Sequence, residues 1–189
     1  MCKIVYLTTK RFDKPAKQFQ KALAEELRRR KIEVVEDNAY DFLNYFRQHK
    51  TYGIAIAIDF FRDGKEGCGL TLNRNCSYIS RDFAYNLSNN LDILTPRIHW
   101  RDFKFVDSYH KEWFKFFNKI SSDTKAIFYL CTYNNPSDFN HYSIAFPKII
   151  QAFADEIVRC LRSDYNVEDY QKRVKQAKMR ITRVKNNKE

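Results

Sequence analysis

Tyr52–Phe61 (YGIAIAIDFF) is the segment that most constrains how this 189-residue chain can fold. Apolar side chains run through it without the alternation that marks a strand with one face in water. It is also far too short to cross a bilayer. A strand that is covered on both faces has this pattern, which is typical of parallel sheets that carry helices on each side. We therefore expect this segment to be a central strand of an α/β domain.

Strand and helix patterns alternate along most of the chain. The helical pattern after the first strand begins at Asp13, a favourable N-cap, and ends in the basic run Arg28–Lys31. The order of the elements predicts a three-layer α/β fold with a mostly parallel central sheet flanked by helices. This domain is predicted to cover residues 1–162, and residues 163–189 are predicted to be a separate basic amphipathic C-terminal helix or tail. We expect strands at 3–9, 32–35, 52–61 and 126–131, an edge strand at 70–72, helices at 14–31, 40–46, 80–91, 111–120 and 144–161, and a loop at 134–138.

The composition is that of a packed globular protein. Hydrophobic residues make up 44% of the chain, and it contains only four Gly and four Pro. The first residues lack the charged, apolar and small-residue regions of a secretory signal. The five cysteines are odd in number and have no Cys-x-x-Cys spacing, so the sequence predicts neither a disulfide framework nor a cysteine-rich zinc site. We expect a cytoplasmic location with reduced thiols, of which Cys131 and Cys160 fall in apolar segments.

Most of the net charge of +11 belongs to the C-terminal segment. Residues 171–189 contain eight Lys or Arg and one acidic residue. The apolar stripe Tyr170–Val184 recurs at helical spacing between these cations, which predicts an amphipathic helix. Such a helix can bind a polyanion (nucleic acid or an anionic cell-wall polymer), a protein partner or a second copy of the chain, or it can be an ordinary solvated charge run. The candidate polyanion-binding residues are Lys172, Arg173, Lys175, Lys178, Arg180 and Arg183.

Asp59 and Cys131 are the two candidate catalytic residues, because each ends a predicted buried strand. In α/β folds, binding sites lie at the carboxyl ends of the strands. Asp59 can bind a ligand or transfer a proton there, or it can be a turn residue paired with Arg62. Cys131 can be a nucleophile activated by a histidine, or a buried structural thiol. The histidines that could serve as its base are His99, His110 and His141.

Two other segments have both a functional and a structural interpretation. Asn134 opens the 134–138 loop, which is either a ligand-binding loop or a cap for the following helix. Residues 96–104 interleave Arg97, Arg101 and Lys104 with aromatic side chains, a pattern that can stack on bases and bind phosphates. It is equally the pattern of an irregular segment with its rings in the core. The four histidines of the chain show no metal-binding spacing.

Several of these segments resemble the N-acetylmuramoyl-L-alanine amidases, the zinc-dependent enzymes that cut the lactyl-peptide bond of peptidoglycan. Residues 126–131 (AIFYLC), the Asn-Pro-x-Asp sequence at 135–138 and the following helix are similar to that family's last strand, loop and helix. Residues 54–61 are similar to its central strand, and residues 80–91 to the helix that follows. The resemblance covers roughly residues 3–161 and implies the family's α/β fold.

The resemblance does not extend to the residues that would bind zinc or carry the reaction. The family's first histidine ligand follows the first strand, where Thr9–Asp13 contains no histidine. Its glutamate ligand falls within Lys14–Gln20, which contains no acid. Its second histidine falls at Asp59, and its catalytic glutamate within Tyr129–Cys131. We therefore expect a degenerate site with no zinc and no other cofactor.

Three functions are compatible with these patterns. The first is a zinc-free, amidase-like binding or interaction protein whose basic C-terminal helix engages a polyanion or a partner. The second is a divergent peptidoglycan amidase or another hydrolase. The third is a nucleic-acid-binding protein of phage or plasmid origin. In the first, the former cleft is reused for a ligand, and its candidate ligand-binding residues are Asp59, Asn73, Cys131 and Asn134.

Overall fold

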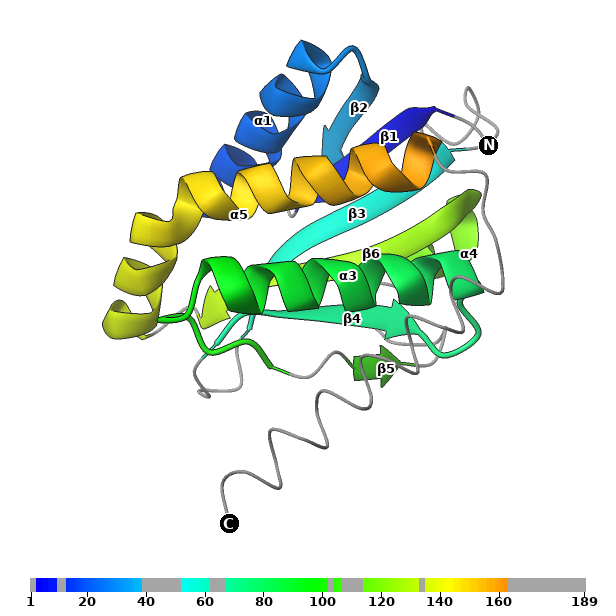
Figure 1. Ribbon diagram of the computed structural model, residues 1–189. Helices are drawn as coiled ribbons and strands as arrows, with labels where there is room; N and C mark the ends of the chain where they lie inside the picture. The colour runs from blue at the N-terminus through cyan, green and yellow to red at the C-terminus, as the bar shows by residue number, and fades with distance from the viewer. Residues whose placement is uncertain are drawn as a thin grey trace.

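A six-stranded sheet forms the centre of the protein (Figure 1). The computed structural model describes residues 3–9, 13–38, 52–61, 67–101, 104–106, 114–132 and 135–162. The strand order is β2-β1-β3-β6-β4-β5, so the segment singled out in the sequence lies in the interior of the sheet. The strands are β1 (Ile4–Thr9), β2 (Glu33–Asn38), β3 (Tyr52–Phe61), β4 (Gly69–Asn73), β5 (Lys104–Val106) and β6 (Ser122–Thr132).

The sheet is mixed but mostly parallel. Strands β2, β1, β3 and β6 are parallel to one another. Strand β4 pairs antiparallel with β6, and β5 pairs parallel with β4. The carboxyl ends of β1, β3 and β6 therefore meet at the same edge as the amino end of β4. We call this the carboxyl edge.

Helices cover both faces of the sheet. Helices α1, α3 and α5 lie on the face seen in Figure 1, and α4 lies behind the sheet. The core has two corresponding clusters, with Ile54, Ile56 and Ile58 of β3 in the larger one and Ala55 and Ala57 in the smaller one. This division confirms the predicted three-layer α/β arrangement with a central strand buried on both faces. The helices are α1 (Lys14–Arg29), α3 (Tyr78–Leu94), α4 (Phe114–Lys119) and α5 (Pro136–Arg162).

Helix α1 forms where the sequence predicts it. The carboxylate of Asp13 accepts a hydrogen bond of 3.1 Å from the backbone N–H of Ala16 and so caps the first turn. Phe19, Leu23 and Leu27 recur at helical spacing and are buried against the sheet. Phe19 packs its ring against Phe128 of β6, with 5.2 Å between the ring centroids.

Two sequence-based expectations, one about residues 70–72 and one about residues 134–138, are wrong. Residues 70–72 were expected at an edge, but they belong to β4, which lies between β6 and β5. The loop expected at 134–138 ends early, because α5 begins at Pro136 and Asn135 caps it by accepting a 3.1 Å hydrogen bond from the N–H of Asp138. The helix predicted at 40–46 lies outside the described residues.

Helix α5 bends near Pro147, as Figure 1 shows. Proline has no backbone N–H and its ring crowds the preceding turn, so a helix kinks where it occurs. The N-terminal half of α5 consequently turns toward the carboxyl edge, whereas the C-terminal half crosses the sheet. Within the part of the chain that the structure describes, no helix is long and apolar enough to cross a membrane.

Candidate functional site

The carboxyl edge of the sheet is the candidate site, because sites in α/β folds lie beyond the carboxyl ends of parallel strands. Thr9 ends β1, Asp59 lies near the end of β3, and Thr132 ends β6. The register between β3 and β6 shifts after Asp59, so that Asp59 pairs with Tyr129 but Phe61 pairs with Thr132. Such an irregularity is common next to sites, since it redirects side chains at a strand's end.

Asp59 is enclosed at this edge. Its exposed fraction is 0%, and one carboxylate oxygen accepts a hydrogen bond of 2.9 Å from the N–H of Phe60. By strand alternation its side chain lies on the same face as Ala55 and Ala57. The structure therefore places Asp59 at the predicted edge, with its side chain enclosed by the protein.

The carboxylate of Asp138 links several segments at this edge, although its sequence context predicts no role for it beyond the loop. It is buried in the first turn of α5. One of its oxygens accepts hydrogen bonds from the N–H of Thr132 (2.7 Å) and the N–H of Gly67 (3.0 Å). A guanidinium nitrogen of Arg101 donates to the hydroxyl of the same Thr132 at 3.0 Å. Three parts of the chain that are distant in sequence, around Gly67, Arg101 and residues 132–138, thus meet here around a buried acid and a half-buried cation.

Gly67 determines where Arg101 lies. Its backbone has φ of 115°, and a Cβ at this position would lie 2.4 Å from the carbonyl oxygen of His99. This close approach lets Cys68 donate to His99 (2.9 Å) and accept from the N–H of Arg101 (2.9 Å). The pairing of Cys68 with Trp100 then directs Arg101 toward the end of β6. No sequence spacing indicates this pairing, because the two segments approach only in the folded chain.

Cys131 is buried at the same edge, and its surroundings suit a structural thiol. Burial, together with the nearby carboxylates of Asp138 and Asp13, raises the pKa of Cys131 to about 12. Burial also raises the pKa of the neighbouring Cys68 thiol. A nucleophilic cysteine needs a lowered pKa and access to substrate, and Cys131 has neither property. The four cysteines in the described segments (Cys68, Cys76, Cys131 and Cys160) are free thiols.

Tyr142 brings a further buried polar group to this region. Among the residues that the structure describes, its hydroxyl has no hydrogen-bond partner, although the residue is buried. Burial is the main cause that raises the pKa of this phenol, and Cys68 and Cys131 lie near enough to add to the effect. Tyr142 is therefore a neutral phenol with an unused donor beneath the edge.

Asn73 is not part of the candidate site, contrary to expectation. It ends β4, which runs antiparallel to β6, and the last registered pair is Leu72 with Ala126. The carboxyl edge lies beyond Tyr129, several residues farther along β6, at ~3.3 Å per residue. The Asn73 side chain instead accepts a 2.8 Å hydrogen bond from the N–H of Asn75 and shapes the turn after β4.

The described residues at the edge do not form the group of metal ligands that the zinc centre of the resembled family requires. In the described ranges, no three His, Cys, Asp or Glu side chains are grouped so that they could hold a metal ion. The carboxylates of Asp59 and Asp138 already accept backbone hydrogen bonds. His49, His110, Asn134 and the whole basic segment 163–189 lie outside the described residues, so the predictions that rest on them stay predictions.

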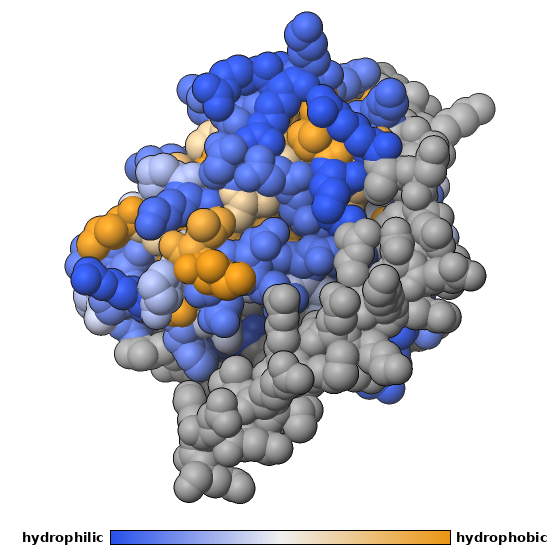
Figure 2. Space-filling view, in the orientation of Figure 1, coloured by the Kyte–Doolittle hydropathy of each residue, from blue (hydrophilic) through white to orange (hydrophobic). Residues whose placement is uncertain are grey.

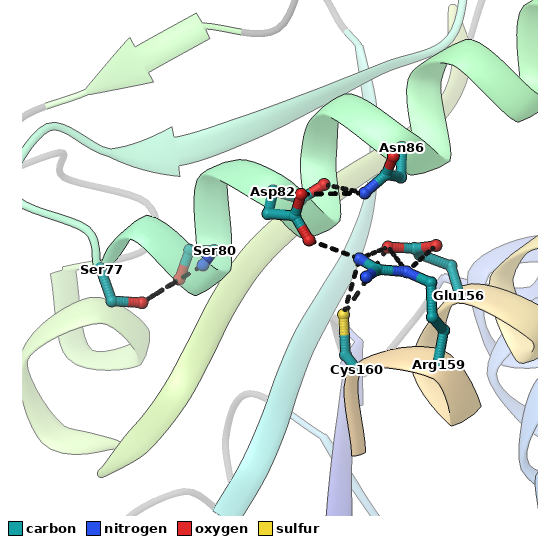
Figure 3. Close-up of polar contacts among 7 residues, drawn as sticks. All are labelled: Ser77, Ser80, Asp82, Asn86, Glu156, Arg159 and Cys160. Carbon is teal, nitrogen blue, oxygen red and sulfur yellow. Dashed lines mark hydrogen bonds and ion pairs between the residues drawn. The ribbon is translucent and has the colours of Figure 1, made fainter. Parts of the chain in front are cut away.

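A second polar cluster joins α3 to α5 on the helical face (Figure 3). The guanidinium of Arg159 contacts Asp82 at 2.6 Å and Glu156 at 2.5 Å, and both carboxylates are almost completely buried. Asn86 donates a 3.0 Å hydrogen bond to the other oxygen of Asp82. Burial raises the pKa of Glu156, and the adjacent guanidinium opposes that shift. This cluster faces the neighbouring helix and not the carboxyl edge, so its role is to hold the two helices together.

Solved structures of an endolysin catalytic domain and of N-acetylmuramoyl-L-alanine amidases have a similar arrangement of strands and helices. The catalytic domain of the CD27L endolysin targeting Clostridia difficile matches with a TM-score of 0.65, covering 82% of this chain and 97% of that one at 11% identity. The chain shares the fold of the N-acetylmuramoyl-L-alanine amidases. Amidase AmiC2 of Nostoc punctiforme matches with a TM-score of 0.64, covering 85% of this chain and 98% of that one at 12% identity.

The same fold occurs in an amidase that is bound to another protein. The CwlD amidase from Clostridioides difficile, in complex with the GerS lipoprotein, matches with a TM-score of 0.58 at 14% identity, covering 84% of this chain and 98% of that one. These comparisons confirm the fold that the sequence resemblance implied. No protein-family model matches the sequence, and no curated protein matches it significantly.

Proposed function

We propose that this protein is a peptidoglycan amidase-type hydrolase that binds muramoyl-peptides at the carboxyl edge of its sheet. The observation that carries the proposal is the fold, because the chain spans nearly the whole length of the endolysin catalytic domain and of the AmiC2 structure. At the edge where α/β folds place their sites, Arg101, Thr132 and Asp138 supply polar groups in one network.

Arg101 is the residue best suited to hold such a substrate. The stem peptides of peptidoglycan carry carboxylates, and guanidinium groups bind carboxylates through paired, charge-assisted hydrogen bonds. Its bond to the Thr132 hydroxyl fixes one nitrogen, and a guanidinium has five N–H donors in total. This bond places the guanidinium of Arg101 at the carboxyl edge, beside the buried carboxylate of Asp138.

A muramoyl-peptide assay tests this proposal. The purified chain is mixed with a soluble N-acetylmuramoyl-peptide, with and without added Zn²⁺, and both binding and release of the free peptide are measured. We expect Arg101→Gln to weaken binding about tenfold, by the loss of one charged contact. The matched control is Arg29→Gln, because Arg29 is exposed at the far end of α1. Equal effects of the two variants on the binding affinity would refute the placement of the site at the carboxyl edge.

The second candidate is a binding protein that uses the same fold without hydrolysis. It is favoured by the lack, among the described residues, of three side chains grouped to hold a metal ion. It predicts muramoyl-peptide binding with no release of peptide, whether or not Zn²⁺ is added. Peptide release that depends on Arg101 would instead support the hydrolase, and the absence of both binding and release would exclude both candidates.

The role of the basic segment is proposed separately, because residues 163–189 lie outside the described residues. We propose that it binds a polyanion or a protein partner; an amidase of this fold has been solved in complex with a lipoprotein. Each phosphate that it neutralised would make the affinity for nucleic acid more dependent on salt. Truncation after Arg162 should therefore abolish the salt-sensitive electrophoretic mobility shift that the full chain causes in DNA or RNA. An unchanged mobility shift would contradict this role.

The cytoplasmic location predicted from the sequence can be checked by cell fractionation.

A further inference from the structure

A cleft of about 230 Å³ lies between the end of α3, the turn at 95–98 and the N-terminal half of α5. Apolar surface gathers over these two helix ends, at the left of Figure 2. Ile144 of α5 is 67% exposed and Leu94 of α3 is 41% exposed, although both are large apolar side chains. The apolar residues that line the cleft are Leu94, Pro96, Ile98, Ile144 and Ala145.

Three basic side chains line the same cleft, namely Arg97, His141 and Lys148. No acidic residue is among the described residues that line it. None of the three forms a side-chain hydrogen bond or ion pair with another residue in the part of the chain that the structure describes. An apolar surface beside the cations of Arg97 and Lys148 complements a ligand that has an anionic group on an apolar body.

Hydrogen bonds within the chain and the bend in α5 order the walls of the cleft in the free protein. The Thr95 hydroxyl donates to the carbonyl of Leu91 at 2.5 Å and accepts from the indole N–H of Trp100 at 2.7 Å. The N–H of Ile98 donates to the carbonyl of Thr95 at 2.9 Å, which closes a turn with Pro96 at its second position. On the other wall, the bend at Pro147 brings the first half of α5 toward α3. A preformed site loses little conformational entropy on binding.

We propose that this cleft binds a medium-chain monocarboxylate, with the chain on Leu94 and Ile144 and the carboxylate beside Arg97 and Lys148. The volume is below the ~300–1,000 Å³ of sites for drug-sized ligands, so it suits a small molecule. Covering two exposed apolar side chains supplies the driving force, and the cations select the charge. This inference is independent of the proposed hydrolase function, since none of the lining residues belongs to the Arg101–Asp138 network.

Octanoate is the probe, and its binding can be followed by calorimetry and by tryptophan fluorescence. The chain has two tryptophans, so Trp113→Phe leaves Trp100 as the only reporter, bonded to Thr95 in the cleft wall. We expect octanol to bind about tenfold more weakly than octanoate because it lacks the charge. Acetate should give no saturable binding, because it lacks the apolar chain.

Two pairs of variants locate the site. Ile144→Ser should weaken octanoate binding about tenfold through lost apolar contact, whereas Ile93→Ser should leave it unchanged. Ile93 is a matched control, because it is 71% exposed and does not line the cleft. Lys148→Gln should weaken binding by about two- to fivefold, the range expected for one exposed charge pair. Both Ile variants alter exposed side chains, so they should fold normally.

Three results would overturn the proposal: no saturable binding of octanoate, equal affinity for octanol, or equal effects of Ile144→Ser and Ile93→Ser. None of these outcomes changes the result expected in the muramoyl-peptide assay, because that result depends on Arg101. Conversely, a failed muramoyl-peptide assay would not alter the expected octanoate result.

Discussion

Replacing Arg159 with Met should strongly destabilise the protein without disturbing the carboxyl edge. The guanidinium lies between Asp82 and Glu156, whose exposed fractions are 3% and 2%. Methionine keeps most of the side-chain volume but removes the positive charge. Two buried carboxylates would then face each other across α3 and α5 without the cation that stabilises them.

The expected loss follows from the burial of the two acids. Removing one partner of a buried ion pair costs roughly 3–5 kcal/mol, because the other charge is left uncompensated. The Arg159 side chain is 29% exposed, so water can partly replace it and the lower end of that range applies. We expect about 3 kcal/mol, which for a domain of this size corresponds to a fall of about 6–12 °C in Tm.

The loss of stability in Arg159→Met should depend on pH, and the direction follows from the pKa of Glu156. Burial raises the folded-state pKa of Glu156 above its unfolded value, so its contribution to stability is fullest below pH ~4.3 and declines as pH rises through the folded pKa. Without Arg159, the folded-state pKa should rise further. The deficit of Arg159→Met relative to wild type should therefore be larger at pH 8 than at pH 5.

Urea denaturation followed by circular dichroism measures both effects. Arg162→Met is the matched control, because Arg162 lies one turn later on α5 and is exposed. Adding Glu156→Gln to Arg159→Met removes one buried charge and should recover about 1–2 kcal/mol. The reasoning fails if Arg159→Met costs no more than Arg162→Met, or if the double variant is no more stable than Arg159→Met alone.

Three other predictions concern single positions. Gly67→Ala should cost about 2–3 kcal/mol in urea denaturation, because φ is 115° and the new Cβ would meet the His99 carbonyl; an unchanged midpoint would contradict this account. The amine of Lys125 donates to two carbonyls near the end of α4, and burial lowers its pKa. The unfolded chain therefore binds the proton more tightly, so wild type should gain stability over Lys125→Met as pH rises from 8 to 10, and a constant difference would count against it. Cys131→Ala should not change the number of thiols that react with an aromatic disulfide reagent in the native state, since a pKa of about 12 leaves almost no thiolate; the loss of one reactive thiol would show that Cys131 is accessible.

Local patterns predicted the elements of the fold well, because each depends on neighbouring residues. The apolar run of β3 and the capped, amphipathic α1 could be identified from spacing alone. The position of β4 could not, since strand order and direction depend on contacts between distant segments. Asn73 was therefore grouped with Asp59, although the antiparallel pairing of β4 places it away from the carboxyl edge.

The candidate site was predicted less completely, for a related reason. Asp59 and Cys131 were found because they end apolar runs, and the structure places both at the carboxyl edge. The network of Asp138 was missed because its partners are backbone N–H groups, including that of Gly67, 71 residues away in sequence. Backbone donors have no signature in the sequence, so only the folded chain could show that Asp138 and Arg101 share one site.

The bend at Pro147 divides helix α5 into two parts with separable roles. The C-terminal part carries Arg159 and binds α3 through buried charges, whereas the N-terminal part carries Asp138 at the edge and Ile144 at the cleft. Arg159→Met should therefore lower stability while the remaining folded protein binds octanoate with unchanged affinity. Ile144→Ser should do the reverse, since its side chain is exposed. If Arg159→Met weakened octanoate binding in the folded protein, the two halves of α5 would be coupled across the bend, and the cleft would depend on the packing of the whole helix.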